Sequence, residues 1–298
     1  MNQSQPQDLH ARQHRLDLTT PRIMGVLNTT PDSFSDGGNF LSTDKAIAHG
    51  LHLLDSGADI LDIGGMSTRP GAAEVSADEE RARTYPVIKA IRVKRPEAIL
   101  SIDTMKAEVA EAALEAGADI INDVRGLADE PRLAELAASS GAGLILMHSS
   151  GTPDVMQSKT QYNEFPGDIL RALEKSAQFA KRSGVRAQQI ILDPGFGFGK
   201  TAQQSTEMLQ HVQDFANLGY ALLCGLSRKS FLGWITGVEI AKDRDVATHT
   251  AGLLCLQQGA QILRVHDVIG ARDSLAVWRA YSNLLSEKQE VSEFNQAT

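Results

Sequence analysis

The sequence predicts an α/β fold, a (β/α)8 TIM barrel formed by a single domain. Eight apolar runs begin near residues 23, 59, 99, 119, 143, 189, 221 and 262. Continuous apolar runs are typical of parallel strands that are buried on both faces. Eight β–α units in about 260 residues match the usual size of this barrel. A doubly wound open sheet is the alternative fold, but eight successive units without a break in composition favour closure.

A short repeat marks the joints between these units. Gly-Ala-Asp-Ile at 57–60 recurs at 117–120, and weaker copies stand at 141–144, 219–222 and 259–262. Glycine adopts the left-handed conformation that ends a helix and lets the chain turn back into a strand. The predicted helices between the runs cover residues 45–56, 106–116, 131–139, 168–182, 206–218, 245–258 and 271–286. The first is expected to begin after a polar cap at 42–44.

The two ends of the chain lie outside this pattern. Residues 21–286 hold the predicted catalytic barrel. Residues 1–20 are expected to form either a mobile N-terminal arm or an extra element at the barrel floor. Residues 287–298 are expected to form a frayed C-terminal tail.

Composition excludes several classes of partner. The net charge of −8 over 298 residues argues against nucleic acid and against an anionic membrane. No apolar run approaches the roughly 18 residues of a membrane span. The N-terminus lacks the apolar stretch of a signal peptide, and Cys224 and Cys255 both lie in apolar surroundings. We therefore expect a cytoplasmic protein with two buried thiols.

The apolar runs end on or just before polar side chains that are suited to chemistry. These are Asn28, Asp62, Asp103, Asn122, His148, Asp193, the Ser227-Arg228-Lys229 segment and His266. Parallel barrels build their active sites at the carboxyl ends of their strands. The pattern therefore predicts an active-site rim. Two long loops, residues 29–40 and 64–75, follow the first two strands and are expected to act as lids.

Arg264 and His266 are the most specific candidates for an anion site among these residues. They are two residues apart on a strand, so both side chains point to the same face. Arginine suits a phosphate group, and anion sites are common near the seventh and eighth strands of this barrel. The alternative is a structural ion pair between Arg264 and a neighbouring Asp.

The remaining candidates could hold a flat heterocycle and a metal. Asp103, Asn122 and Asp193 can grip N–H donors and carbonyls around one axis, although each alone could be a turn residue. Lys229 can bind an anion or a carbonyl oxygen. Asn28 is a neutral oxygen ligand suited to a Mg²⁺ ion that is held mostly by water and substrate phosphates.

One motif fails a closer test. Residues 195–201, Gly-Phe-Gly-Phe-Gly-Lys-Thr, look like a phosphate-binding P-loop. Pro194 stands where that motif requires its first glycine. The spacing therefore excludes a P-loop.

In order along the chain, the segments resemble the dihydropteroate synthases. The resemblance covers roughly residues 22–270 and rests on these stretches: 24–28 with 30–38, 64–65 with 67–71, 101–104, 121–123, 192–200, 227–230 and 264–267. The two glycine-rich loop signatures are its most specific parts. The resemblance implies a folate-biosynthesis transferase that joins 4-aminobenzoate to a hydroxymethyl-dihydropterin diphosphate and releases diphosphate with the help of Mg²⁺.

The resemblance also implies roles for individual residues. Asp103, Asn122, Asp193 and Lys229 would hold the pterin, and Asn28, Arg264 and His266 would hold the diphosphate and Mg²⁺. Thr68, Arg69, Pro70, Phe198, Lys229 and Ser230 would shape the aminobenzoate pocket. Catalysis would fall to Asp103, Lys229, Arg264 and His266. A homodimer formed through the late helices, away from the site, is also implied.

Two positions depart from the family pattern. Met66 stands where the family usually has Glu, and Ser149 follows His148 where Met is common. Two alternative functions follow from the same fold. One is a pterin-dependent methyltransferase domain, which needs no diphosphate site. The other is a pterin-binding paralogue without catalysis.

Overall fold

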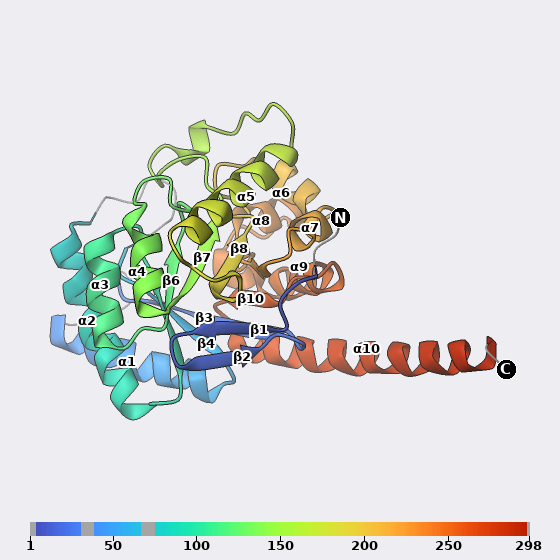
Figure 1. The fold of residues 1–298 in the computed structure, drawn as a ribbon, viewed down its shortest axis with the longest axis horizontal. Helices are drawn as coiled ribbons and strands as arrows, with labels where there is room; N and C mark the ends of the chain where they lie inside the picture. Colours follow the sequence, from blue (N-terminus) through green and yellow to red (C-terminus); the bar gives the residue numbers. More distant parts are fainter. Residues whose placement is uncertain (1–3, 31–38, 67–74, 297–298) are drawn as a thin grey trace.

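A computed structural model describes residues 4–30, 39–66 and 75–296. Their side chains are described too, except at 39–42 and 283–296. Eight parallel strands close into a barrel in the order β10-β3-β4-β5-β6-β7-β8-β9 (Figure 1). The strands are β3 Arg22–Asn28, β4 Ile60–Gly64, β5 Ile99–Asp103, β6 Ile120–Asp123, β7 Gly143–Met147, β8 Ile190–Asp193, β9 Ala221–Cys224 and β10 Ile262–Val265. The predicted (β/α)8 barrel is confirmed, and the open sheet is excluded.

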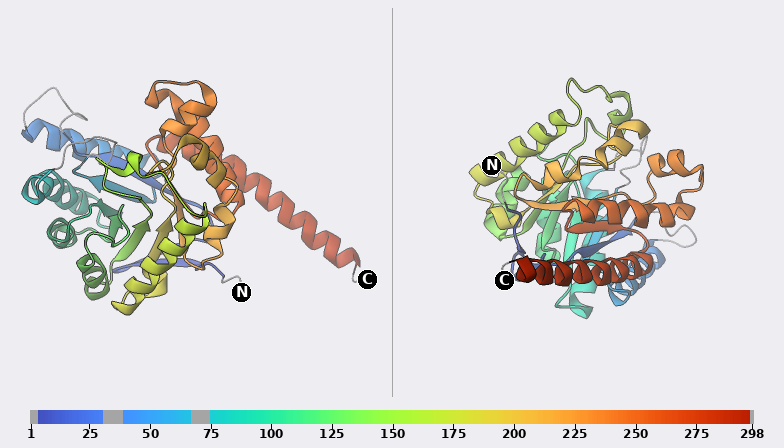
Figure 2. Two further views of the ribbon diagram at one scale, coloured as in Figure 1. Left: turned by 90° about the horizontal axis from the view of Figure 1, so that it is seen from above. Right: turned by 90° about the vertical axis from the view of Figure 1, so that its right-hand side faces the viewer.

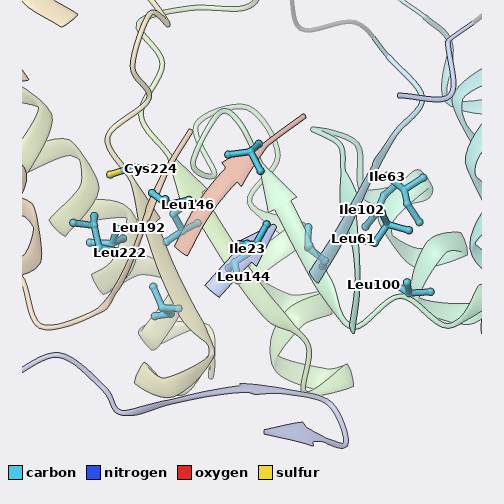
Figure 3. Packing of buried hydrophobic residues seen from close by; sticks show 14 of the residues in the cluster. Ile23, Leu61, Ile63, Leu100, Ile102, Leu144, Leu146, Leu192, Leu222 and Cys224 are labelled. Carbon is cyan, nitrogen blue, oxygen red and sulfur yellow. The ribbon is translucent and has the colours of Figure 1, made fainter. Parts of the chain in front are cut away.

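Side chains alternate across the barrel wall because a strand has a period of two. On the outer face, residues such as Ile23, Leu61 and Leu144 belong to the large apolar layer between strands and helices (Figure 3). On the inner face, a second buried cluster fills the lower barrel. Its strand members are Met24, Ile60, Ile99, Ile120, Ile145, Ile191, Ala221, Leu223 and Ile262. This apolar inner layer is the floor on which the site rests.

The N-terminal residues form an element at this floor. Strands β1 Asp8–Ala11 and β2 His14–Asp17 pair as an antiparallel hairpin below the barrel (Figure 1). Leu9, Ala11 and Leu18 of this segment are buried in the inner cluster. Of the two alternatives for residues 1–20, the described part, residues 4–20, forms the element at the barrel floor.

The helices surround the barrel (Figure 2). They are α1 Asn39–Asp55, α2 Ala77–Lys94, α3 Ala107–Ala116, α4 Arg132–Ser140, α5 Gly167–Arg182, α6 Ala202–Met208, α7 Val212–Ala216, α8 Ser230–Thr236, α9 Asp245–Gln257 and α10 Val268–Gln296. Short 3-10 turns lie at Met156–Ser158, Ala187–Gln189 and Ala241–Arg244. Among the described helices, none is long and apolar enough to cross a membrane.

Three helix predictions need correction. Helix α1 begins at Asn39, so the expected cap at 42–44 lies inside the helix. The single helix expected at 206–218 is two helices, because i−3 bonds tighten the turn at Leu209, Gln210 and His211. Helix α10 continues to Gln296, since no Pro or Gly follows Gly270 to stop it, so residues 287–296 of the expected frayed tail are helical, and residues 297–298 lie outside the described residues.

Helix α2 was not predicted at all. Ser76 caps it by accepting a hydrogen bond from the Glu79 N–H, and acidic residues fill its first turn. Its buried face carries Glu80 and Thr84 beside its apolar residues, and Pro86 lies inside it. The usual amphipathic pattern is therefore missing.

Candidate functional site

A polar layer lies directly above the apolar floor on the inner face of the barrel. It consists of Asp62, Ser101, Asp103, Asn122, Asp193 and Arg264, and the first five have at most 8% of their surface exposed. Each lies an even number of residues beyond a floor residue of its own strand, so alternation turns it inward. Asn28 shares this parity with Met24 on β3. The strands therefore bring the predicted residues to one end of the barrel interior.

An ion-pair cluster occupies the centre of this layer. Arg264 Nε donates to Asp62 Oδ2 at 2.7 Å, and Arg264 Nη2 donates to Asp103 Oδ2 at 2.8 Å. Asn122 Nδ2 donates to the same Asp62 oxygen at 3.0 Å. Four strands thus contribute to one hydrogen-bonded group, which fixes the Asp103 carboxylate and the Asn122 amide in place.

Burial and charge shift the pKa values of Asp103 and Arg264 in this cluster. Burial raises the pKa of Asp103 to about 7, although the Arg264 guanidinium opposes the shift. Burial also works against the charge of Arg264. Asp62 and Asp103 outweigh that effect, so the pKa of Arg264 is raised and the guanidinium stays charged. A carboxyl group with a pKa near 7 beside a fixed cation is typical of functional sites.

The prediction that Arg264 and His266 converge on one anion stays a prediction, and the structure gives each side chain a protein partner. Arg264 is held in the structural ion pair, the alternative named above. His266 Nδ1 lies 2.8 Å from Ser227 Oγ, which also accepts from the His266 N–H at 3.1 Å. Arg264 lies on β10 and His266 directly follows it, and the two side chains have separate partners, because the Arg264 guanidinium pairs with the buried carboxylates of Asp62 and Asp103.

Lys229 lies against the loop that follows β8. Its ammonium donates to the Phe196 carbonyl and sits 4.3 Å from the centre of the Phe198 ring, a cation–π contact. Burial lowers the pKa of Lys229 to about 7, although Asp193 opposes the shift. Burial shifts the pKa of Asp193 in the opposite direction and raises it. The Oδ1 of Asp193 accepts a hydrogen bond from the Gly195 N–H at 2.8 Å. Lys229, Asp193 and Phe198 therefore belong to one site.

Two neighbours of Lys229 differ in their settings. Ser230 is exposed at the first turn of α8. Arg228 makes two 2.8 Å hydrogen bonds to the carboxylate of Asp245. Its backbone adopts a φ of 60°, a conformation that is uncommon outside glycine. The two hydrogen bonds from the Arg228 guanidinium to Asp245 stabilise the turn on which Lys229 lies.

Thr68, Arg69 and Pro70 lie outside the described residues. The residues on either side of that segment are described. Lys106 Nζ donates to the Val75 carbonyl at 2.6 Å and to Glu80 Oε2 at 2.7 Å, and it lies 3.9 Å from Met66 Sδ. Lys106 thus contacts both ends of the second predicted lid.

The donor set fits a Mg²⁺ ion held through phosphate. Asn28 offers one neutral amide oxygen at the carboxyl end of β3. Within the described ranges, no three His, Cys, Asp or Glu side chains gather as a metal cluster. Mg²⁺ commonly keeps several waters and binds through one or two protein oxygens plus substrate phosphates. Asn28 is compatible with that mode.

Three positions near the site had no individual role in the sequence-based prediction. Asp62 was placed on the predicted rim at the end of a strand that in fact continues to Gly64, and its parity with Ile60 turns it inward. Lys200 was set aside with the failed P-loop, yet only 3% of it is exposed and it contacts His148. Lys106 carried no local signal, because its partners are distant in sequence.

Comparison with known proteins decides the family to which this chain belongs. Residues 24–266 match the family model described as "Pterin binding enzyme". The chain is 42% identical over 275 residues to the dihydropteroate synthase of Haemophilus influenzae, covering 92% of this chain and 99% of the relative. This chain belongs to the dihydropteroate synthase family. Members of this family are transferases.

Further members of the dihydropteroate synthase family agree. The Streptococcus pyogenes enzyme is 47% identical over 257 residues, covering 86% of this chain and 93% of the relative. The Xanthomonas albilineans dihydropteroate synthase, solved with 4-aminobenzoic acid, has a TM-score of 0.87 at 40% identity and covers 93% and 98% of the two chains. A second structure of that enzyme, in complex with 7,8-dihydropteroate, has a TM-score of 0.83 at 38% identity, covering 92% and 98%.

Proposed function

We propose that this chain condenses 6-hydroxymethyl-7,8-dihydropterin diphosphate with 4-aminobenzoate, giving 7,8-dihydropteroate and diphosphate. The buried Arg264–Asp62–Asp103 cluster carries this proposal, together with Asn122, Asp193 and Lys229 around it. It offers carboxylate acceptors, an amide and an ammonium at the open end of one barrel. That set complements a flat ring with N–H donors on one edge and a carbonyl on another.

The chemistry requires charge stabilisation more than a strong base. A dihydropterin ring stabilises positive charge at its exocyclic methylene, so the carbon–oxygen bond to diphosphate can break before the amine attacks. The anionic forms of Asp103 and Asp193 favour this electron-poor ring. The aromatic amine is nucleophilic when neutral and loses its proton after attack.

The departing diphosphate needs compensating positive charge. Two of the three Arg264 nitrogens bind carboxylates, and the third, Nη1, is the one we assign to the diphosphate together with His266. When bound, Mg²⁺ would neutralise phosphate charge beside Asn28. Asn28 on β3, Arg264 on β10 and His266 directly after β10 would then surround the leaving group, since these two strands are neighbours in the barrel.

The aminobenzoate is assigned to the space bordered by Phe198, Lys229 and Ser230, with Thr68, Arg69 and Pro70 from the second loop. A Yersinia pestis dihydropteroate synthase of 40% identity has been solved as a sulfonamide drug complex, with a TM-score of 0.86 and coverage of 93% and 99%. We therefore propose that sulfonamides compete with 4-aminobenzoate here.

Diphosphate release tests the proposal. Purified protein is given the pterin diphosphate with and without 4-aminobenzoate, in Mg²⁺ or in EDTA. We expect release that depends on Mg²⁺. Pterin binding without release would favour the non-catalytic paralogue, and methyl transfer from a methylated pterin would favour the methyltransferase.

The pH dependence of kcat/KM for the pterin diphosphate should be bell-shaped with its maximum near pH 7. Asp103, with a pKa of about 7, gains its required charge as pH rises. Lys229, also about 7, loses its required proton as pH rises. Each limb should fall roughly tenfold per pH unit. In Lys229→Arg, kcat/KM should still fall on the acid side but should stay constant on the alkaline side up to about pH 9, because arginine keeps its proton there. A flat profile for the wild-type protein would contradict the assignment.

Met66→Glu should leave the Kd of the pterin diphosphate within about twofold of wild type. Met66 is nearly buried and its sulfur faces Lys106 rather than the polar layer. The new carboxylate would pair with Lys106, so any change should appear in the KM for 4-aminobenzoate. Calorimetric titration with the pterin measures this, and a tenfold change in Kd would place residue 66 in the pterin site.

The late helices offer a surface for a homodimer. Large apolar side chains are exposed on α8, α9 and α10 and on the turn between α8 and α9: Trp234, Ile235, Ile240, Val246, Leu254, Val277 and Tyr281. Monomers rarely expose so many large apolar groups in one region. We propose that two copies associate here, in the cytoplasm as the sequence predicts. Val246→Glu should shift the sedimentation coefficient from dimer to monomer.

A further inference from the structure

The glycine-rich loop after β8, residues 195–199, has every backbone carbonyl turned toward a side-chain donor. Lys200 Nζ donates to the carbonyls of Gly195 at 2.9 Å and Phe198 at 3.0 Å. The Phe196 carbonyl accepts from Lys229. Gln157 donates to the Gly197 carbonyl at 2.8 Å, and Tyr162 donates to that of Gly199 at 2.8 Å.

Alternating glycines give the loop this shape. Gly195, Gly197 and Gly199 all have positive φ, of 70°, 76° and 64°. A Cβ at Gly195 would lie 2.0 Å from the His148 carbonyl oxygen, and one at Gly199 would lie 1.6 Å from Ser150 Oγ. The loop therefore packs directly on the chain that leaves β7, and only glycine fits at these two contacts.

The loop is the inverse of the P-loop that its sequence resembles. A P-loop turns N–H groups toward a phosphate. Here carbonyl oxygens surround an amino group, as carbonyl oxygens replace the water around a cation in other proteins. Lys200 Nζ also lies 3.0 Å from His148 Nδ1 and 3.4 Å from the His148 carbonyl. Its side chain is buried, and burial lowers the pKa of Lys200 well below its usual value, although Asp193 opposes the shift. The loop therefore closes around an amino group that belongs to the chain itself and donates to these carbonyls.

The loop also determines where the groups of the site lie. The Phe196 carbonyl is the hydrogen-bond acceptor of Lys229, and the Phe198 ring is its cation–π partner. Lys200 holds the carbonyls of Gly195 and Phe198, which flank Phe196 in the sequence. Displacing these carbonyls would move both partners of Lys229.

We propose that Lys200 is a positioning residue, the internal N–H donor around which the 195–199 loop folds to present the Phe196 carbonyl and the Phe198 ring to Lys229. It acts through the loop and touches no substrate. The inference rests on the proposed function, because Lys229 and Phe198 are its link to pterin and aminobenzoate. Its chemical identity is also specific: a small amine with N–H donors should replace the amino group.

Lys200→Ala tests this proposal, because it opens a space where a small ammonium ion can bind. We expect the Kd of the pterin diphosphate to weaken about tenfold and kcat/KM to fall about 100-fold in protein that is folded by circular dichroism. Ethylammonium at tens of millimolar should restore kcat/KM at least tenfold. Tetramethylammonium, which has no N–H donor, should restore nothing. Lys181→Met, on the exposed end of α5, is the matched control and should behave as wild type.

Tyr162→Phe provides a second test if Lys200→Ala does not fold. It removes the hydrogen bond to the Gly199 carbonyl and the hydroxyl's hydrogen bond with Ser150, and should weaken pterin binding about threefold at an unchanged melting temperature. The proposal is overturned if folded Lys200→Ala binds pterin as wild type does, or if ethylammonium and tetramethylammonium act alike. It is equally overturned if Lys200→Ala does not fold and Tyr162→Phe binds as wild type. Wild-type turnover in the same assay keeps a failure of this inference distinct from a failure of the proposed function.

Discussion

Arg264→Met is expected to lower the free energy of unfolding by about 3–5 kcal/mol and to abolish measurable turnover. The substitution leaves Asp62 and Asp103 buried beside each other without their shared cation. It also removes the charge that we assign to the departing diphosphate. Urea unfolding at pH 8 measures the first effect, and diphosphate release measures the second.

The two effects of Arg264 can be separated. A triple variant, Asp62→Asn, Asp103→Asn and Arg264→Met, removes the unpaired charges together with the cation. It should recover much of the lost stability, because neutral amides cost less to bury than unpaired carboxylates. Turnover should stay absent. Wild-type stability and turnover in Arg264→Met alone would show that the ion pair is not central.

Asp103→Ala is expected to reduce kcat/KM for the pterin diphosphate by about 1,000-fold or more, roughly 4 kcal/mol of transition-state stabilisation, with the fold intact. Arg264 keeps its bond to Asp62 in this variant, so no buried cation is left alone. The loss follows from the missing acceptor at the end of β5. Steady-state kinetics and circular dichroism on the same sample measure both parts.

Asp129→Ala is the matched control for Asp103→Ala. Asp129 is a half-exposed carboxylate paired with Arg125 on the surface beyond β6. Its removal should leave kcat/KM within about twofold of wild type. Turnover retained by Asp103→Ala would remove this residue from the site and leave the buried cluster a purely structural role.

The barrel was predictable because its strands follow simple local rules. Each strand is a short apolar run buried on both faces, and the glycine joints at 57 and 117 end the preceding helical segments with positive φ. Strand parity then places Asp103, Asn122 and Asp193 on the inner face with no knowledge of distant contacts. The fold and the polar layer of the site therefore follow largely from local sequence.

Other features depend on contacts between distant parts of the chain. Nothing near Arg264 in the sequence shows that its guanidinium would bind Asp62 and Asp103, which are 202 and 161 residues away. Helix α2 was not predicted because its buried face includes Glu80, which pairs through Oε2 with Lys106 from the segment before α3. Such ion pairs replace the apolar pattern on which a sequence-based prediction relies.

The most direct test of the account is the identity of the product. Purified protein would receive the pterin diphosphate, Mg²⁺ and isotope-labelled 4-aminobenzoate, and the mixture would be analysed by mass spectrometry. We predict labelled 7,8-dihydropteroate in equal amount to the diphosphate released, and none with Asp103→Ala. Diphosphate release without labelled dihydropteroate, or pterin binding without either product, would contradict the proposed reaction.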